Sequence, residues 1–309
     1  MEETNAALPI KPKLSIRSCT AEGVSNLKFA VFTVMMPEYT VENTVSALSR
    51  HGYDGVEWRV APIDPGKLQE KPSFWGNNHS TIHVDSSEQE LLAVKRLMDD
   101  AGLACVNLGC YLKVGDLAAV ERDMRTAKLL GAPSIRVAVP GYNRTRAYDD
   151  LFKEGRAYLE GVQELAGQYG VQGLIEMHMN FIAPSAGLAR RLVEGLDPAR
   201  IGVIYDPGNM VYEGYEQYRM GLELLDEYLA HVHIKNAWPE RNPDRKTEND
   251  PLWRTVSAPI HEGCANWRQV IGDLKSVGYD GWVSFEDFSQ SAPTEQLLAD
   301  NIAYIKSLL

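Results

Sequence analysis

The chain has 309 residues, of which 44% are hydrophobic and 24% are charged, a composition typical of a soluble globular protein. Lys and Arg total 31 and Asp and Glu total 42, so the net charge is −11, opposite in sign to the charge that binding to a phosphate backbone requires. We therefore expect no nucleic-acid partner.

Residues 1–27 lack clear periodicity and are expected to form an N-terminal extension. The first residues are acidic and polar, and the longest apolar runs of the chain are strand-sized, so we expect neither a signal peptide nor a membrane span. The four cysteines, Cys19, Cys105, Cys110 and Cys264, contain no close-spaced pair of the zinc-knuckle kind. Reduced thiols in a cytoplasmic protein are the expected reading.

From residue 28 to the last residue, short β-rich runs alternate with longer stretches of helical periodicity. The predicted strands are KFAVFTV at 28–34, GVEWRV at 55–60, ACVNLG at 104–109, SIRVAV at 134–139, VQGLIEMH at 171–178, IGVIYD at 201–206, AHVHIKN at 230–236 and GWVSFED at 281–287. Eight βα units in about 280 residues match the size of a closed (β/α)8 barrel. The sequence therefore predicts an α/β fold, a single-domain TIM barrel over residues 28–309.

An open doubly wound sheet is the alternative fold. Such a sheet usually carries a Gly-rich phosphate loop after its first strand. This chain instead has Met35, Met36 and Pro37 at that place. The closed barrel is therefore the preferred prediction.

Two connections are longer than a barrel requires, residues 60–85 after the second strand and residues 237–265 after the seventh. Both follow strands, so both are expected on the catalytic face, as lids or binding walls. Side chains on or beside these loops are candidates to line a substrate pocket: Trp58, Arg59, Trp75, His79, His83 and Trp238.

Four late segments, GLIEMHMN, VIYDPGN, HVHIKN and VSFEDF, run from apolar residues into Glu176, Asp206, His233 and Glu286. Ligands on four adjacent strands can converge on one ion, and three carboxylates with one imidazole suit an exchangeable divalent cation. By itself, Asp-Pro-Gly-Asn after the sixth strand is also an ordinary turn. His231 lies a layer deeper than His233 and is expected to be a hydrogen-bonded core residue.

The order Glu-x-His, Asp-x-Gly-Asn, His-x-His-x-Lys-Asn and Ser-Phe-Glu at successive strand ends resembles the xylose-isomerase-like superfamily of TIM barrels, which includes sugar and sugar-phosphate isomerases and epimerases. The resemblance covers residues 28–309. It implies one Mn²⁺ ion, or Mg²⁺, Co²⁺ or Zn²⁺ in its place, held by Glu176, Asp206, His233 and Glu286.

In the ketose 3-epimerases of that superfamily, the first and last ligand glutamates, here Glu176 and Glu286, also move the proton. A histidine follows the Asp ligand by three residues and an arginine follows the His ligand by six, and these positions are Asn209 and Pro239 here. Asp-x-Gly-Asn resembles the motif of pentulose-5-phosphate 3-epimerases, which makes Asn209 a substrate-binding candidate. Two lyase groups are similar in the same sense, the 3-dehydroshikimate dehydratases and the metal-binding subunits of enzymes that split 3-oxo-C-glycosides.

These activities share the removal of a proton α to a carbonyl, which a bound cation assists by stabilising the enolate. We expect a cytoplasmic sugar isomerase or epimerase of carbohydrate metabolism. The alternative is a carbon–oxygen or carbon–carbon lyase acting on a 3-oxo-sugar or cyclic ketone. His178 and Lys235 each lie two residues beyond a ligand on the same strand face, so they are candidates for proton transfer or for hydrogen bonding to a ligand.

Two other classes are less consistent with the sequence. Endonuclease IV, a DNA-repair member of the same superfamily, needs many histidines and a basic face, whereas this chain has seven histidines and a net charge of −11. A barrel that binds a sugar without chemistry would have no need of an intact ligand set. The expected partner is a small sugar-like ketone, with a homo-oligomer and a small partner subunit both left open.

Overall fold

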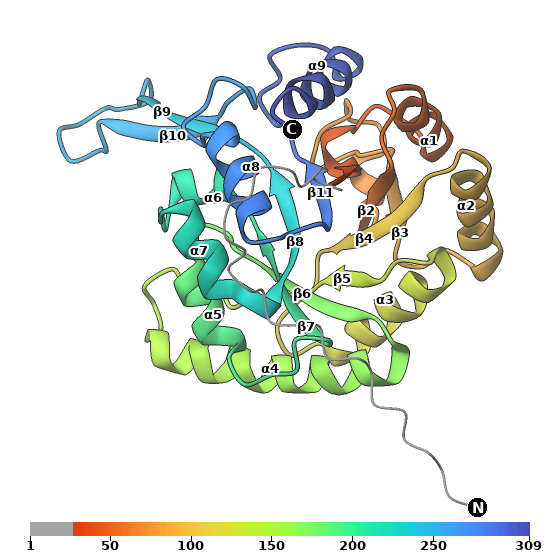
Figure 1. Cartoon of the computed structure of the whole chain (residues 1–309), viewed down its shortest axis with the longest axis horizontal. Helices are drawn as coiled ribbons and strands as arrows, with labels where there is room; N and C mark the ends of the chain where they lie inside the picture. Colours follow the sequence, from red (N-terminus) through yellow and green to blue (C-terminus); the bar gives the residue numbers. More distant parts are fainter. Residues whose placement is uncertain (1–26) are drawn as a thin grey trace, which may run out of the picture.

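Eight parallel strands close into a barrel in the computed structural model, which describes residues 27–309 (Figure 1). They follow one another around the barrel as β1, β11, β8, β7, β6, β5, β4 and β2, and pairing of β1 with β2 closes the ring. Their bounds are β1 Lys28–Phe32, β2 Gly55–Ala61, β4 Ala104–Cys110, β5 Ser134–Arg136, β6 Gln172–Glu176, β7 Ile201–Tyr205, β8 Leu229–Ile234 and β11 Trp282–Phe285. The predicted (β/α)8 barrel is confirmed.

The helices form an outer ring around the strands (Figure 1). They are α1 Val41–Arg50, α2 Glu88–Asp100, α3 Leu117–Leu130, α4 Tyr148–Tyr169, α5 Ala186–Val193, α6 Pro207–Tyr212, α7 Tyr218–Leu225, α8 Trp267–Ser276 and α9 Thr294–Lys306, with short 3₁₀ turns at Thr33–Met35, Pro65–Lys67 and Asp226–Tyr228. No helix of the described residues is long and apolar enough to cross a membrane.

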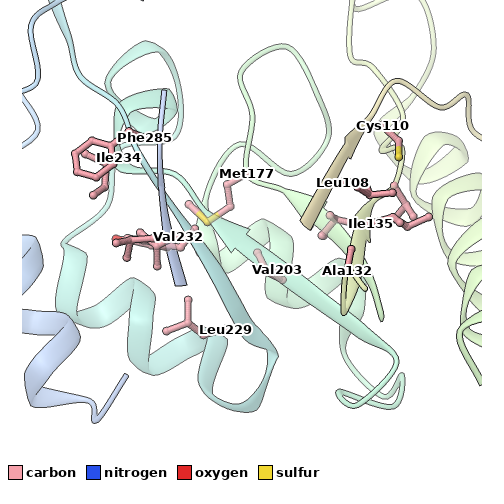
Figure 2. Packing of buried hydrophobic residues seen from close by; sticks show 14 of the residues in the cluster. Leu108, Cys110, Ala132, Ile135, Met177, Val203, Leu229, Val232, Ile234 and Phe285 are labelled. Atoms are coloured by element: carbon pink, nitrogen blue, oxygen red, sulfur yellow. The ribbon is translucent and has the colours of Figure 1, made fainter. Parts of the chain in front are cut away.

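Alternation along each strand separates an apolar outer layer from a polar barrel interior. Figure 2 shows Val232 and Ile234 of β8 and Leu108 of β4 in the buried apolar cluster. The residues that alternate with them along the strands form buried polar contacts inside the barrel instead. These are His231, His233 and Asn107. Burial of the outer layer against the helices supplies the hydrophobic stabilisation, and it leaves the interior available for chemistry.

Six predicted strands extend one to three residues beyond the observed ends. The largest difference is at 134–139, where regular pairing stops at Arg136. Most of the extra residues follow the carboxyl ends of the strands, where several side chains line a cavity, whereas Thr33 and Val34 belong to a short 3₁₀ turn. The predicted extension 1–27 lies outside the described residues except for Leu27, and so does Cys19.

Both long connections, which the sequence predicts as loops, contain strands. Residues 60–85 include β3 (Thr81–His83), which adds to β2 in parallel, and residues 237–265 include the antiparallel hairpin of β9 (Ala237–Arg241) and β10 (Trp253–Ser257). This hairpin projects from the barrel in Figure 1. Of the described cysteines, Cys105 and Cys110 are buried and Cys264 is exposed, and none forms a disulfide.

Candidate metal centre

Four potential ligands meet at the carboxyl-terminal end of the barrel. They come from the neighbouring strands β6, β7, β8 and β11 or the residue that follows them, and they are Glu176, Asp206, His233 and Glu286. One ligand atom of each lies within 4.8 Å of the others, and all four residues are buried. The structure therefore brings together the four side chains that the sequence singles out.

The Asp-Pro-Gly-Asn turn gives Asp206 two contacts at once. Its Oδ1 accepts from the backbone N–H of Asn209 at 2.9 Å and caps α6, with Pro207 at the first helical position. Its Oδ2 faces the cluster, 3.9 Å from Nδ1 of His233, and accepts from Lys235 at 3.0 Å. The motif can therefore be both a turn and a source of a metal ligand, because Oδ1 caps the helix while Oδ2 faces the cluster.

His233 contacts carboxylates through both ring nitrogens. Nδ1 lies 3.3 Å from Oε1 of Glu176 and 3.6 Å from Oε2 of Glu286, while Nε2 lies 3.2 Å from Oε2 of Glu57. Burial alone would lower the pKa of His233, but the charges of Glu57 and Glu286 hold it well above its usual range. A cation bound at Nδ1 of His233 would take the place of the hydrogen on that nitrogen, and the Nε2–H would still donate to Glu57.

Glu57 anchors a buried hydrogen-bond network that crosses the barrel interior. It accepts from Asn107 at 2.8 Å and lies 3.0 Å from Nε2 of His231, which also contacts Ser284 at 2.9 Å. Burial opposes ionisation of Glu57, but the charges of His233 and His231 outweigh it and keep the pKa of this carboxyl well below its usual range. A carboxylate that holds the far nitrogen of a ligand histidine fixes the orientation of its ring.

Arg136 is a site residue that the sequence reading missed. Its guanidinium donates to Oε2 of Glu176 at 2.6 Å and lies 5.4 Å from the ring centre of Phe32. Burial opposes ionisation of Glu176, yet Arg136 and then His233 hold its pKa well below the usual range. The Phe32 ring fits inside the barrel because Gly109 has no Cβ, which would otherwise lie 2.2 Å from it. An arginine alternating with apolar residues in a strand was the available signal.

Lys235 supplies a second positive charge to the cluster. Its ammonium donates to Oδ2 of Asp206 at 3.0 Å and to Oδ1 of Asn209 at 3.1 Å, and it forms an ion pair with Glu286. Burial would lower the pKa of Lys235, but these carboxylates raise it above its usual range. In this arrangement Lys235 donates hydrogen bonds to the side chains around it. Gly208 permits this packing, since a Cβ there would lie 2.6 Å from Lys235.

The donor set fits a divalent cation. The three buried carboxylates of the cluster, Glu176, Asp206 and Glu286, share two cationic side chains, Arg136 and Lys235. Buried carboxylates that outnumber their positive partners are costly unless a further cation approaches them. Three carboxylates and one imidazole on a rigid barrel are ligands that Mn²⁺, Mg²⁺ or Zn²⁺ accept.

A cavity of about 510 Å³ opens above the cluster. Glu176, Lys235 and Glu286 lie in its lining, together with three other residues that the sequence singled out, Trp75, His178 and Asn209. The Nδ1 of His178 lies 2.8 Å from the carbonyl oxygen of Met179. Because a carbonyl only accepts, Nδ1 carries the hydrogen and Nε2 is left as an acceptor.

Trp58 and Arg59 of β2 were predicted to line the cavity, but neither does. Trp58 is fully buried on the outer side of the strand, where its Nε1 donates to Sδ of Met98 in α2 at 3.2 Å. Neighbours in a strand point to opposite faces, so Trp58 cannot share the inward direction of Glu57 and Arg59. Arg59 donates to Thr81 at 2.6 Å and supports the cavity from behind, without lining it.

Three further pocket candidates lie elsewhere. His79 is exposed and bonded through its backbone to Pro37, and His83 is half-buried on β3 beside Asp85. Trp238 lies half-buried in β9, paired with Val256 of the hairpin. None of these three residues is part of the cavity lining.

Comparison with known proteins gives one family match over most of the chain. The model of a family described as xylose isomerase-like TIM barrel matches residues 45–308. Among relatives of curated function, an inosose dehydratase from Bacillus licheniformis is 28% identical over 141 residues, which cover 43% of this chain and 47% of the relative. The chain thus matches about half of the length of that relative.

Solved structures of other proteins share the fold over nearly the whole barrel. A 3-keto-D-glucoside 4-epimerase from E. coli has a TM-score of 0.67 at 18% identity, with 91% of this chain and 99% of that chain covered. A xylose isomerase-like TIM barrel protein from Mycobacterium smegmatis in complex with magnesium has a TM-score of 0.63 at 16% identity, with 91% and 96% covered.

Proposed function

The chain belongs to the xylose isomerase-like TIM barrel family, and on that basis we propose that it is a divalent-metal-dependent enzyme that removes a proton next to the carbonyl of a sugar or sugar-like ketone. The observation that carries the proposal is the convergence of Glu176, Asp206, His233 and Glu286 beneath the cavity. Solved relatives of the same fold include a magnesium complex, which supports a cation of this kind.

A cation held by these four residues would polarise the ketone carbonyl and stabilise the negative charge of the enolate. The protein's own groups would then bind the remaining hydroxyls. Lys235 and Asn209 lie in the cavity lining beside the cluster, so a substrate hydroxyl can share the hydrogen bonds that they make to Asp206 and Glu176. Arg136 also lies there, so a substrate oxygen can share its guanidinium with Glu176.

His178 is the residue proposed to accept the α-proton. It is half-buried in the cavity lining, and its acceptor nitrogen Nε2 is not used by the Met179 contact. Glu286 is the second candidate, since both oxygens of Glu176 already accept, from Arg136 at 2.6 Å and from Asn209 at 3.1 Å. Reprotonation of the enolate on another carbon or face would give an isomer or an epimer.

Elimination is the second candidate reaction. Here the base takes the α-proton, the bond from the β-carbon to its hydroxyl breaks, and a donor protonates the departing hydroxide to water. The unequal surroundings of the two glutamates favour elimination, since Glu176 accepts from Arg136 and Asn209 whereas Glu286 pairs with Lys235. Epimerisation by two carboxylates on opposite faces requires two comparable bases. The inosose dehydratase relatives support the same choice.

Deuterium exchange tests the shared step. Protein loaded with Mn²⁺ would be incubated in D₂O with ketoses, their phosphates, inososes and 3-oxo-glycosides, and the products read by NMR. We expect deuterium at the carbon next to the carbonyl, or an unsaturated product if elimination follows. Hydrolysis with ¹⁸O from water and no α-C–H cleavage would move the protein to the hydrolases.

The proposed base has its own variant. His178→Asn should lower the exchange rate by about 100-fold or more, the usual contribution of a general base, with metal content unchanged. His261→Asn is the matched control, because that histidine is exposed and lies outside the cavity lining. Equal exchange in the wild type and His178→Asn would exclude His178 as the base and leave Glu286.

A further inference from the structure

The cavity lining divides into a polar side and an apolar side. Glu176, His178, Asn209, Lys235 and Glu286 come from β6, β7, β8 and β11 and the residues after them, and Arg136 adds a charge from the end of β5. The segments after β4, β5 and β6 contribute an apolar wall, which we define as Leu112, Val114, Val137, Val139, Met179 and Phe181. Because β4, β5 and β6 are consecutive staves, the wall is continuous and lies to one side of the ligand cluster.

The apolar wall is almost free of charge. Among the residues of 110–114 and 137–141 that line the cavity, Lys113 alone is charged, and it is exposed. Leu112, Val114 and Phe181 are only half-buried, so they present apolar surface to the cavity. Such surface next to a polar centre is typical of a binding site with two parts.

The wall is held in place before any ligand arrives. Gly141 and Phe181 form an antiparallel bridge between the connections after β5 and β6. The backbone of Tyr142 donates to Asn180 at 2.7 Å, and that of Ile182 donates to Pro140 at 3.0 Å. A wall fixed in this way loses little conformational entropy when a ligand packs on it.

Tyr111 marks the border between the two sides. The guanidinium groups of Arg59 and Arg136 both lie 5.0 Å from its ring centre, within range of a cation–π contact. Arg136 also reaches Glu176, so the ring is connected to the ligand cluster. The polar and apolar sides are therefore placed at a fixed separation.

A free sugar does not use both sides. Its hydroxyls match the polar side, and its C–H face can pack on Phe288, which lies 5.3 Å below the ammonium of Lys235. A volume of about 510 Å³ is in the range of sites for drug-sized ligands. If only a free sugar were bound, the apolar wall would remain in contact with water.

We propose that the substrate is a sugar ketone that carries a hydrophobic substituent, of the size of an aryl group, which packs on the apolar wall. This proposal rests on the proposed function, in that the sugar ketone lies over the ligand cluster. It assigns the connections after β4 and β5 a specificity role that the chemistry itself does not require.

Phenyl β-D-glucoside and methyl β-D-glucoside are suitable probes, because neither contains a carbonyl and neither can react. Their binding to the full metal-loaded chain would be measured by saturation-transfer NMR titration. Burial of a phenyl ring should make the phenyl glucoside bind about tenfold more tightly or better, with the largest saturation on its aryl protons. Leu112→Asn should reduce this phenyl-to-methyl ratio at least threefold.

Leu224→Asn is the matched control, since Leu224 is a partly exposed leucine of α7 away from the cavity. It should leave the ratio unchanged. No binding of phenyl glucoside, a wild-type ratio below about three, or equal losses in both variants would overturn the proposal. Deuterium exchange separates this proposal from the proposed function. Exchange without a preference for the phenyl glucoside would refute the hydrophobic substituent and leave the proposed reaction intact. A preference without exchange would refute the proposed reaction and leave the substituent.

Discussion

At the scale of single residues, His233 depends on a residue that is not itself a ligand. Its Nε2 lies 3.2 Å from Glu57, and this contact aims Nδ1 at Glu176, Asp206 and Glu286. Glu57→Gln keeps the shape but removes the charge. We expect metal affinity to fall by about 10- to 100-fold, as for other residues that orient ligand histidines, in a metal titration followed by calorimetry.

The control for Glu57→Gln is Asp123→Asn, which changes another buried carboxylate that lies in α3 and pairs with Arg122. That variant should lower stability without changing metal affinity. If both variants lower the affinity equally, the effect comes from general loss of packing, and Glu57 has no orienting role.

Arg136 compensates the charge of Glu176 in the metal-free protein. Arg136→Met leaves this buried carboxylate without its closest partner, a change that typically costs about 3–5 kcal/mol of unfolding free energy. A cation bound to Glu176 supplies the missing charge, so the loss should shrink when Mn²⁺ is present. Chemical unfolding with and without Mn²⁺ measures the difference.

Arg122→Met provides the comparison, because it removes the partner of the buried Asp123 far from the ligand cluster. Its loss of stability should be the same with and without Mn²⁺. If the stability loss of Arg136→Met is also the same with and without Mn²⁺, no cation binds near Glu176.

The sequence indicated the four candidate ligands but not the residues that hold them in place, and the reason is physical. Glu176 and His233 stand out at strand ends because each breaks an apolar run, and their convergence follows from a parallel barrel. Glu57 and Arg136 are equally unusual in apolar strands, but their partners lie on other staves, and only the closed barrel brings them together. Trp58 lies outside the barrel because it follows the inward-facing Glu57 in β2, and successive side chains of a strand point to opposite faces.

At the scale of elements, the connection after β2 already touches the cavity. Trp75 lines it and packs at 5.1 Å on Phe288, and the same segment is anchored where Asn78 donates to Val34 and Phe74. Because 60% of Trp75 is exposed, its removal costs little stability. Trp75→Ala should lower kcat/KM by about 3- to 10-fold, the value of one aromatic contact, while metal content and melting temperature stay unchanged.

Trp253→Ala is the matched control for that loop, since Trp253 is similarly exposed on β10 and lies outside the cavity lining. It should leave kcat/KM unaltered. Unchanged kinetics for Trp75→Ala with every accepted substrate would remove the loop after β2 from substrate binding.

Helices α1 and α9 are joined across the seam of the barrel by Glu295. Its carboxylate accepts from Arg50 at 2.6 Å, from His51 at 2.8 Å and from Tyr39 at 2.9 Å, and these contacts lower its pKa to about 2. A carboxyl with a depressed folded pKa stabilises the fold above its unfolded pKa, near 4.5, and loses that contribution as pH falls toward 2. Nearly half of the side chain is exposed, so screening by solvent keeps the contribution below about 1 kcal/mol.

Glu295→Gln should therefore be less stable than the wild type at pH 6, and the gap should narrow steadily between pH 4.5 and pH 3. Urea unfolding at several pH values measures both trends. Glu223→Gln, which breaks a contact within α7 only, serves as control. A gap that stays constant with pH would show that the Glu295 contacts do not act through its charge.

The order of elements was more predictable than their ends. Alternating strand and helix periodicity indicated all eight barrel strands, since each must bury an apolar outer face against helices. The β9–β10 hairpin was not found, because Pro239 and the charged residues around it conceal the period-two pattern of a two-stranded arm. Such an arm pairs only with itself, and little burial constrains its sequence.

At the scale of the whole molecule, the fold places three buried carboxylates, Glu176, Asp206 and Glu286, around one point in a chain of net charge −11. One bound cation should therefore stabilise the native state measurably. At a free metal concentration 100 times Kd, binding to the native state adds about 2.7 kcal/mol to the unfolding free energy. Glu176→Gln and Asp206→Asn should abolish this gain. Asp287→Asn, which changes a buried acid hydrogen-bonded to Asn301 and not in the cluster, should retain it.

The stoichiometry decides between the two acidic–imidazole clusters of the described residues. The second cluster, Glu57, His231 and His233, is also close enough to hold an ion. However, both oxygens of Glu57 and the Nε2 atoms of His231 and His233 already pair with one another and with Asn107 and Ser284 at hydrogen-bond distances. Elemental analysis after reconstitution should therefore find one divalent ion per chain, and His231→Gln should leave that number unchanged. Two ions per chain, with one lost in His231→Gln, would place a second metal in the barrel interior, whereas one ion that survives both Glu176→Gln and Asp206→Asn with unaltered affinity would mean that the proposed ligands are wrong.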